Sequence, residues 1–241
     1  MNIKLKSIVF FIFVIYIYFN YFYVPYVFHY DSKKKGVNLF ILGSVHGNEP
    51  AGTHSCYQLI EFIKQKKLKI KYGSITILPL PNPVGFYLNS RYQFKLNNSD
   101  INRNFINSGK DRMSKLILTY VKKSNFVIDL HEGWGFHKLQ NSLGSTITNT
   151  NSKQARTVAK KMLTSINKKI KHRKCKFTRL IKHKDFKHCN PRGSLGCYCQ
   201  RHQINYILIE ISGQNDLQNL KTRVKQDIIL LCTAISTLKI K

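Results

Sequence analysis

Two histidines and a glutamate have the side chains and the spacing of metal ligands. His46 and Glu49 lie three positions apart in the segment 43–52 (GSVHGNEPAG), directly after a short apolar run. Ligands at positions i and i+3 of a turn can reach one ion from the same side. His131 ends a second apolar run, VIDLH. Two histidines and one carboxylate leave a fourth coordination position for water, which is the arrangement of a catalytic zinc site.

Each of these elements also has a simpler interpretation. An HxxE pattern often arises by chance, as a surface histidine followed by a glutamate at the start of a helix. The glycines beside it favour a metal site, because they let the backbone fold tightly around an ion. A histidine at the end of a buried strand is more often a hydrogen-bonded core residue than a ligand. The position of His131 at the carboxyl end of a strand, where His46 also lies, favours a ligand role.

A polar loop and a buried carboxylate complete the set of candidate residues. The segment 100–105 (DINRNF), with Arg91 upstream, is rich in Asn and Arg. Such a loop can bind a carboxylate through a guanidinium fork and amide donors, although a solvated loop has the same composition. Glu210 lies inside the apolar run YILIEIS. Its burial is costly unless it is paired or near a metal, and burial raises a carboxyl pKa toward the range used for proton transfer.

These residues must be positioned by alternating strands and helices. Apolar runs predict strands at 37–42, 74–80, 126–130 and 205–211, and helical spacing predicts helices at 51–66, 112–123, 152–169 and 217–238. Strands that alternate with helices favour a three-layer α/β/α fold, with a mixed, mostly parallel sheet covered on both faces. Active sites of such sheets lie beyond the carboxyl ends of the strands, where the candidate residues also lie.

The N-terminus predicts a membrane-spanning segment. Residues 8–28 are almost wholly apolar, and a helix of this length spans about 30 Å, the thickness of a bilayer core. Lysines follow at 33–35, and no small-residue cleavage site follows the apolar run. We therefore expect residues 1–35 to form an N-terminal transmembrane helix, an uncleaved signal-anchor, with a basic linker before one domain at 36–241. Cleavage as a signal peptide, with secretion of the domain, is the alternative.

The charge of the chain does not identify a partner by itself. There are 40 Lys and Arg residues against 11 Asp and Glu, a formal net charge of +29. Such a balance fits nucleic acid, an anionic membrane surface or an acidic substrate. The joint abundance of Lys, Ile, Asn, Phe and Tyr is also what an AT-rich coding sequence produces without any such partner, and we do not expect nucleic acid to be one. The six cysteines form no CxxC pair, which argues against a zinc ribbon.

Four segments in this order, HGNEPAG, DINRNF, IDLH and IEIS, resemble the motifs of the zinc carboxypeptidase superfamily. The resemblance extends from about residue 39 to residue 213. It is strongest to the short members of the superfamily, the murein-peptide amidases and the succinylglutamate desuccinylase/aspartoacylase branch. It implies a zinc-dependent hydrolase with one Zn²⁺ ion per chain.

The resemblance also implies a role for each matching residue. His46, Glu49 and His131 would bind the zinc ion. Asp100 would orient His46, because a ligating histidine usually needs a partner for its second ring nitrogen. Glu210 would take a proton from the attacking water and pass it to the leaving amine. Further roles follow for five residues: oxyanion stabilisation by Arg91, binding of the substrate carboxylate by Asn102 and Arg103, and a wall of the substrate pocket by Gly193 and Ser194 of the segment 191–196 (PRGSLG).

We therefore expect a membrane-tethered metallocarboxypeptidase or peptide amidase that cleaves an amide bond next to a free carboxylate. Its substrate would be a small peptide. A deacylase of N-acyl amino acids, like the succinylglutamate desuccinylases and aspartoacylases, is the first alternative. A catalytically inactive, membrane-tethered binding module is the second, although all four motifs are intact. Tyr198 and Tyr206 are candidates for an active-site tyrosine, but neither has the expected spacing, so the sequence does not assign this role.

Overall fold

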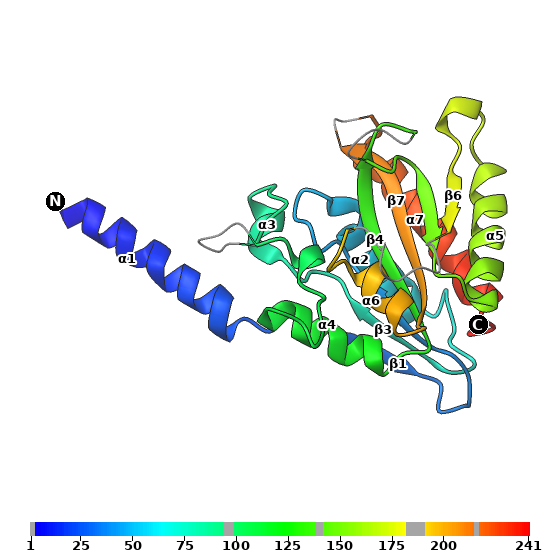
Figure 1. The fold of residues 1–241 in the computed structure, drawn as a ribbon, viewed down its shortest axis with the longest axis horizontal. Coiled ribbons are helices and arrows are strands. Elements are labelled where there is room, and N and C mark those ends of the chain that lie inside the picture. Colours follow the sequence, from blue (N-terminus) through cyan, green and yellow to red (C-terminus); the bar gives the residue numbers. More distant parts are fainter. Residues whose placement is uncertain (1–2, 94–98, 138–141, 182–190, 215–216) are drawn as a thin grey trace.

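The computed structural model describes residues 3–93, 99–137, 142–181, 191–214 and 217–241. In this described part of the chain, seven strands form one sheet (Figure 1). The strands are β1 (Phe28–Asp31), β2 (Asn38–Leu42), β3 (Ser74–Leu78), β4 (Phe126–Trp134), β5 (Thr146–Asn149), β6 (Thr178–Ile181) and β7 (Asn205–Gln214). The α-helices are α1 (Ile3–Ile17), α2 (Pro50–Lys64), α3 (Pro83–Tyr87), α4 (Arg112–Lys122), α5 (Lys153–Asn167), α6 (Leu195–Arg201) and α7 (Leu220–Thr237). All four predicted strands are present as β2, β3, β4 and β7, and all four predicted helices as α2, α4, α5 and α7.

The sheet is mixed, with a parallel centre. Its order is β1-β3-β2-β4-β7-β5-β6. β3, β2, β4 and β7 run parallel to one another, whereas β1 pairs antiparallel with β3 and β5 pairs antiparallel with β7. Parallel neighbours need long crossover connections, which the helices between these strands provide. The predicted mixed, mostly parallel sheet is confirmed.

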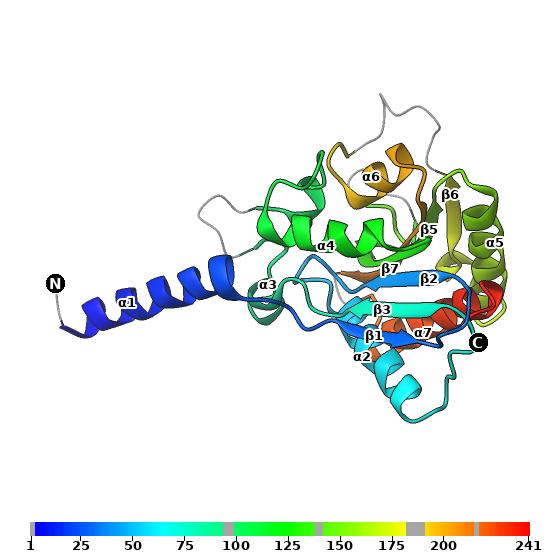
Figure 2. The same ribbon diagram turned by 90° about the horizontal axis from the view of Figure 1, so that it is seen from below.

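Helices cover both faces of the sheet, as the sequence predicts. α2, α5 and α7 pack on one face, and α4 and α6 pack on the other (Figure 2). Alternate residues of β4 enter the two cores: Ile128 and Leu130 contribute to the first, and Val127 contributes to the second. Because side chains alternate along a strand, Asp129 and His131 point to the face of α4 and α6.

The helices begin where their sequences provide caps. α4 starts after Asp111, whose carboxylate accepts from the backbone N–H of Ser114, while the Ser114 hydroxyl accepts from the N–H of Asp111. α5 and α7 start after Ser152 and Asn219, whose side chains accept in the same way from residues three positions further along. α2 starts with Pro50, which is favoured at a first helical position. The caps satisfy N–H groups that the first turn of a helix leaves without partners.

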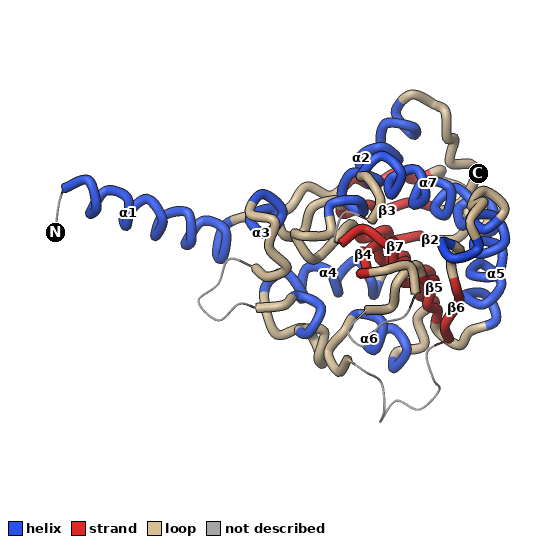
Figure 3. The backbone as a smooth tube through the Cα atoms, turned by 90° about the horizontal axis from the view of Figure 1, so that it is seen from above, coloured by secondary structure: helices blue, strands red, loops and turns tan. Residues whose placement is uncertain are grey.

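The N-terminal helix α1 extends away from the body of the protein (Figures 1 and 3). It covers 15 residues and continues into a short π-helical turn, Tyr18–Phe22. Among the residues that the structure describes, none of the helices combines the length and the apolar character needed to cross a bilayer. The structure therefore does not support the transmembrane helix predicted for residues 8–28. The α-helix ends at Ile17, and Phe28, the last residue of the apolar run, begins a strand.

Three strands have no counterpart in the sequence prediction: β1, β5 and β6. Each has four residues, too few for a recognisable periodic pattern. β1 lies in the stretch that the sequence assigns to the anchor and linker. It pairs with β3 along its whole length, so the sheet includes residues that precede residue 36. Such short strands are specified by the neighbours with which they pair rather than by their own residues.

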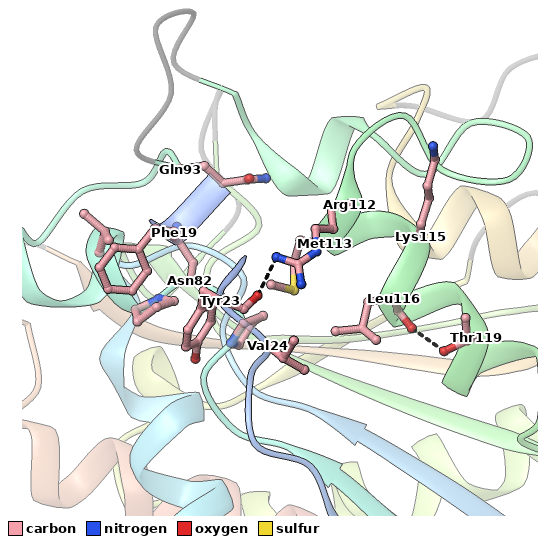
Figure 4. A pocket seen from close by; sticks show the side chains of 13 residues that line it. Phe19, Tyr23, Val24, Asn82, Gln93, Arg112, Met113, Lys115, Leu116 and Thr119 are labelled. Atoms are coloured by element: carbon pink, nitrogen blue, oxygen red, sulfur yellow. Dashed lines mark hydrogen bonds between the residues drawn. The ribbon is translucent and has the colours of Figure 1, made fainter. Parts of the chain in front are cut away.

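Hydrogen bonds at Tyr23 help to attach the N-terminal segment to the domain. Nη1 of Arg112 donates to the carbonyl of Tyr23 at 2.8 Å (Figure 4), and the Tyr23 hydroxyl donates to the carbonyl of Leu80 at 3.2 Å. Burial raises the pKa of Tyr23 to about 12, so its hydroxyl keeps the proton that it donates. A cavity of about 290 Å³ lies between this segment, the start of α3 and α4. Its lining includes Phe19 and Met113 but none of the candidate site residues.

Candidate metal centre and active site

The three candidate metal ligands come together at the carboxyl ends of two neighbouring parallel strands. The loop after β2 carries His46 and Glu49, and β4, the parallel neighbour of β2, carries His131. The loop passes very close to α3 because residue 47 is a glycine. A Cβ atom on Gly47 would lie 1.8 Å from the carbonyl carbon of Gly85. The tight loop predicted from the glycines beside His46 is therefore present, and it brings the two ligands to His131, which lies within β4 because the strand continues to Trp134.

The donor atoms of this triad are close enough together to share one ion. Nδ1 of His46 lies 2.8 Å from Oε1 of Glu49, and Nδ1 of His131 lies 2.8 Å from Oε2. The two Nδ1 atoms are 3.2 Å apart, and the candidate ligand atoms all lie within 4.8 Å of one another. Two ligands of a tetrahedral zinc ion, each about 2.1 Å from the metal, are about 3.4 Å apart. The buried triad therefore fits a zinc ion in its distances and in its donor types.

Asp100 holds the ring of His46 in the orientation that a metal requires. Its Oδ1 lies 3.1 Å from Nε2 of His46, which leaves Nδ1 to face the other two residues of the triad. Arg91 donates to Oδ2 of Asp100 from Nε at 3.2 Å and from Nη2 at 3.0 Å. Burial raises the pKa of Asp100, but His46 and Arg91 lower it more, so the pKa lies below its ordinary value. The carboxylate is therefore ionised and can accept the Nε2 proton of His46.

His131 has a comparable partner that the sequence analysis does not assign. Oδ1 of Asp129 lies 3.3 Å from Nε2 of His131, and Oδ2 of Asp129 accepts from the buried hydroxyl of Tyr206 at 2.8 Å. Burial lowers the pKa of His131, but the carboxylates of Asp129 and Glu49 raise it, and the pKa lies well above its ordinary value. The motif IDLH contains a signal for Asp129, because residues two apart in a strand point to the same face. Tyr206 comes from the neighbouring strand, and no local pattern indicates it.

Glu210 lies on β7 directly opposite His131 of β4. Paired residues of parallel strands point to the same face, so the Glu210 side chain lies on the side of the sheet that carries the triad. Burial raises the pKa of Glu210 to about 8; His131 opposes this shift, and the charges of Glu49 and Asp129 add to it. A carboxyl group with a pKa near neutrality can both accept a proton and return it.

This raised pKa predicts how the stability of the metal-free protein depends on pH. The unfolded chain loses the Glu210 proton near pH 4.5, whereas the folded protein keeps it up to about pH 8. Between these values the folded state binds more protons, so this group lowers the free energy of unfolding as the pH rises. Glu210→Gln has no proton to lose and should be more stable than the wild type, by a margin that grows with pH. Urea unfolding with a chelator at about pH 5, 7 and 9 measures the margin, and a constant margin would contradict this prediction.

The DINRNF segment approaches the triad from the side of Asp100. Nδ2 of Asn102 lies 3.4 Å from Nε2 of His131, and Oδ1 of Asn102 accepts from the backbone N–H of Leu195 at 2.9 Å. Nη1 of Arg103 donates to the backbone carbonyl of Asn102 at 2.8 Å, and the Arg103 side chain is 43% exposed. Asn102 therefore lies at the triad, whereas Arg103 lies at the edge of the site with its guanidinium accessible to solvent.

Gly193 and Ser194 support this segment and begin α6. Gly193 has a φ of +90°, and a Cβ atom there would lie 2.3 Å from the carbonyl oxygen of Arg103. The Gly193 carbonyl accepts from the N–H of Phe105 at 2.9 Å. The Ser194 hydroxyl accepts from the N–H of Cys197 at 3.2 Å and caps α6. Both residues lie beside the DINRNF segment, and their contact with a substrate stays a prediction.

The fold is similar to several solved structures. The cell shape determinant protein Csd4 from Helicobacter pylori, in a product-bound structure, has 16% sequence identity and a TM-score of 0.73, with 90% of this chain and 56% of Csd4 covered. An aspartoacylase family protein from Mesorhizobium loti has 18% identity and a TM-score of 0.61, with coverages of 89% and 61%. The ectoine utilization protein EutE from Ruegeria pomeroyi has 14% identity and a TM-score of 0.63, with coverages of 89% and 60%. The chain thus spans less than two thirds of these proteins, and at such identities the likeness establishes the fold.

A family model supplies the assignment that the structural likeness leaves open. No curated protein gave a significant match. The model of the succinylglutamate desuccinylase/aspartoacylase catalytic domain matches residues 35–166, more than half of the chain. This range contains the whole triad and the DINRNF segment, and it ends before Glu210. The chain therefore belongs to the succinylglutamate desuccinylase/aspartoacylase family, within the zinc carboxypeptidase superfamily of hydrolases.

Proposed function

We propose that this chain is a zinc-dependent hydrolase that cleaves an amide bond next to a free carboxylate, as a metallocarboxypeptidase or peptide amidase. The observation that carries the proposal is the triad of His46, Glu49 and His131 on the face of the sheet that also carries Glu210. The structural neighbour Csd4 supports the choice of a peptide substrate, because it is described as a D,L-carboxypeptidase.

The residues of the site can perform the steps of amide hydrolysis. Zinc held by the triad would supply a Lewis acid for the attacking water and the scissile carbonyl. Glu210 accepts a proton from the attacking water and returns it to the leaving amine nitrogen, as its raised pKa permits. Nη1 of Arg91 lies 3.4 Å from Oε1 of Glu49, beside the triad. From there it donates to the carbonyl oxygen of the scissile amide, which becomes negative when water attacks. The water oxygen forms a bond to the carbonyl carbon, the C–N bond breaks, and a carboxylic acid and an amine leave.

We expect Arg103→Ala to weaken substrate binding more than the chemical step. A hydrogen-bonded charge is worth about 1.5–3 kcal/mol, so KM should rise about 10- to 100-fold with a much smaller change in kcat. Arg103→Lys keeps the positive charge but lacks the planar guanidinium fork, so its KM should lie between those of the wild type and Arg103→Ala. Steady-state kinetics on a peptide and its C-terminally amidated form measure the effect. An equal loss on both peptides would contradict a carboxylate-binding role, and Arg156→Ala, an exposed arginine of α5, is the control.

A deacylase of N-acyl amino acids is the second candidate. The family model is that of succinylglutamate desuccinylases and aspartoacylases, and one structural neighbour is an aspartoacylase family protein. Peptides and N-acyl amino acids both place a free carboxylate close to an amide bond. Either reaction therefore uses the same metal ligands, proton acceptor and carboxylate-binding residues. The two candidates differ in the substrate that the protein hydrolyses.

A substrate panel distinguishes the candidates. The zinc-loaded protein is incubated with a mixed peptide library and, separately, with N-acetyl and N-succinyl amino acids, and the released amino acids are quantified. Release of C-terminal residues by the wild type but not by Glu210→Gln supports the carboxypeptidase. Release from N-acyl amino acids alone supports the deacylase. Zinc binding without hydrolysis of either class would support the inactive binding module.

We further propose that the N-terminal segment attaches the domain to a membrane surface. Seven consecutive apolar side chains of α1, from Ile8 to Val14, are each at least 45% exposed. Because successive residues of a helix point in different directions, this stretch is apolar on all sides, which lipid accommodates better than water or one protein groove. The exposed lysines at 33–35 fit the negative surface of an anionic bilayer.

Vesicle flotation tests this attachment. The full chain should float with phosphatidylglycerol vesicles, and a variant with Phe10→Asp and Phe13→Asp should remain in solution because charged side chains are costly in the bilayer. Equal flotation of both proteins would contradict the proposal. A protein released from cells with a mass that lacks the N-terminal segment would instead support secretion after signal cleavage.

A further inference from the structure

Gln214, the last residue of β7, brings its side-chain amide to the metal-binding triad. Nε2 of Gln214 donates to Oε1 of Glu49 at 3.3 Å and to the backbone carbonyl of Glu132 at 2.7 Å. Oε1 of Gln214 accepts from the indole Nε1 of Trp134, and from Nδ2 of Asn48 at 3.4 Å. One amide therefore joins the ends of β4 and β7 to the loop that carries two of the candidate ligands.

The indole of Trp134 decides which way this amide points. An indole N–H can only donate, so the oxygen of Gln214 faces Trp134 and the NH2 group faces Glu49. The reversed amide would place a donor against a donor and an oxygen against a carboxylate. The two side chains meet because the register shifts between Gly133 and Trp134, which puts Gln214 opposite Trp134 in place of Gly213.

Glu49 is held on both of its carboxylate oxygens. Oε2 accepts from the backbone N–H of Glu132 at 3.1 Å, and Oε1 accepts from the amide of Gln214. Donors on the two oxygens oppose rotation of the carboxylate about its Cγ–Cδ bond. A ligand that is held in its binding orientation has less freedom to lose when an ion binds, so its affinity is higher.

We propose that Gln214 is a positioning residue that presents Glu49 to the metal, and that Trp134 fixes the orientation of its amide. The inference rests on the proposed function, because it takes the triad as the zinc site. Trp134 is the only tryptophan of the chain, and it is 47% exposed. Tryptophan fluorescence therefore reports on one site, the indole that donates to Gln214, the residue that contacts Glu49.

The test is the zinc affinity of the purified full chain, measured by competition with a chelating dye. Oε1 of Glu49 accepts from Gln214 and, at 3.4 Å, from Nη1 of Arg91. Gln214→Leu removes the first of these donors at nearly constant volume and should lower the affinity about 10- to 100-fold, the usual loss when a hydrogen-bond partner of a metal ligand is removed. The matched control is Gln218→Leu. Gln218 donates to the carbonyl of Ser212 at 2.8 Å and exchanges hydrogen bonds with Gln226, so its replacement should leave the zinc affinity unchanged.

Two further readouts separate positioning from a general loss of structure. Zinc should change the fluorescence of Trp134 in the wild type, and the midpoint of that change should move to higher zinc concentration in Gln214→Leu. At saturating zinc, Gln214→Leu should recover most of the wild-type kcat, because the triad and Glu210 are intact. Trp134→Phe removes one of the groups that orient the amide, while the Glu132 carbonyl still accepts from it, and should lower the affinity by a smaller factor than Gln214→Leu.

The outcomes distinguish this inference from the proposed function. Wild-type affinity in Gln214→Leu, or an equal loss in Gln218→Leu, would overturn the positioning role and leave the zinc hydrolase intact. If Gln214→Leu does not fold, unchanged affinity in Trp134→Phe would overturn it. A wild-type protein that binds no zinc would overturn both.

Discussion

The His131→Ala variant is expected to bind no zinc under conditions in which the wild type binds one ion per chain. His131 supplies an Nδ1 atom that lies 3.2 Å from Nδ1 of His46 and 2.8 Å from Oε2 of Glu49. Its removal leaves the ion with two of its three protein ligands. It also leaves the buried carboxylates of Glu49 and Asp129 without the imidazole that lies between them. The loss of affinity should exceed the roughly 100-fold that follows removal of a hydrogen-bond partner of a ligand. Hydrolysis should disappear with the metal.

Metal analysis by mass spectrometry after dialysis against a defined zinc concentration measures this effect. His172→Ala is the control, because His172 is an exposed histidine outside the triad and should leave one zinc ion per chain. Near-stoichiometric zinc in His131→Ala would show that the metal binds elsewhere. Such a result would remove the basis of the proposed reaction.

The Glu210→Gln variant is expected to keep its zinc and lose hydrolysis. Glutamine has almost the shape of glutamate but cannot accept the proton of the attacking water. Removal of a general acid–base group typically costs about 10²- to 10⁴-fold in rate, so kcat should fall by about that factor. The triad does not include Glu210, so the zinc content should equal that of the wild type. Glu61→Gln, in an exposed ion pair of α2, should change neither property.

The pH profile provides an independent check on the same residue. Glu210 must be ionised to accept a proton, so kcat/KM of the wild type should rise with pH as this carboxyl ionises. The pKa of about 8 belongs to the metal-free site, and the positive charge of zinc should lower it. The residual activity of Glu210→Gln should lack this acid limb. An unchanged limb in the variant would assign the proton transfer to another group.

The central strands were predictable because their own residues specify them. β2, β4 and β7 are buried on both faces and contain apolar runs that are visible without the fold. β5 and β6 contain polar residues, TITN and TRLI, and their strand conformation depends on pairing at one edge of the sheet. The apolar N-terminus shows the opposite case: a long apolar run predicts one membrane-spanning helix, yet α1 ends at Ile17, a π-helical turn follows, and the last residue of the run, Phe28, begins β1, which pairs with β3.

The sequence by itself determined which residues can bind a metal and move a proton. Side-chain type, spacing and apolar periodicity are local properties, so His46, Glu49, His131 and Glu210 could be selected before any strand was placed. The tertiary structure alone decided which groups from other strands orient them, whereas Asp100, the partner of His46, was already indicated by its motif. Tyr206 and Gln214 act across strands, through the register of β4 and β7. A hydrogen bond needs donor and acceptor within about 3.5 Å, and no local pattern encodes the register that brings them there.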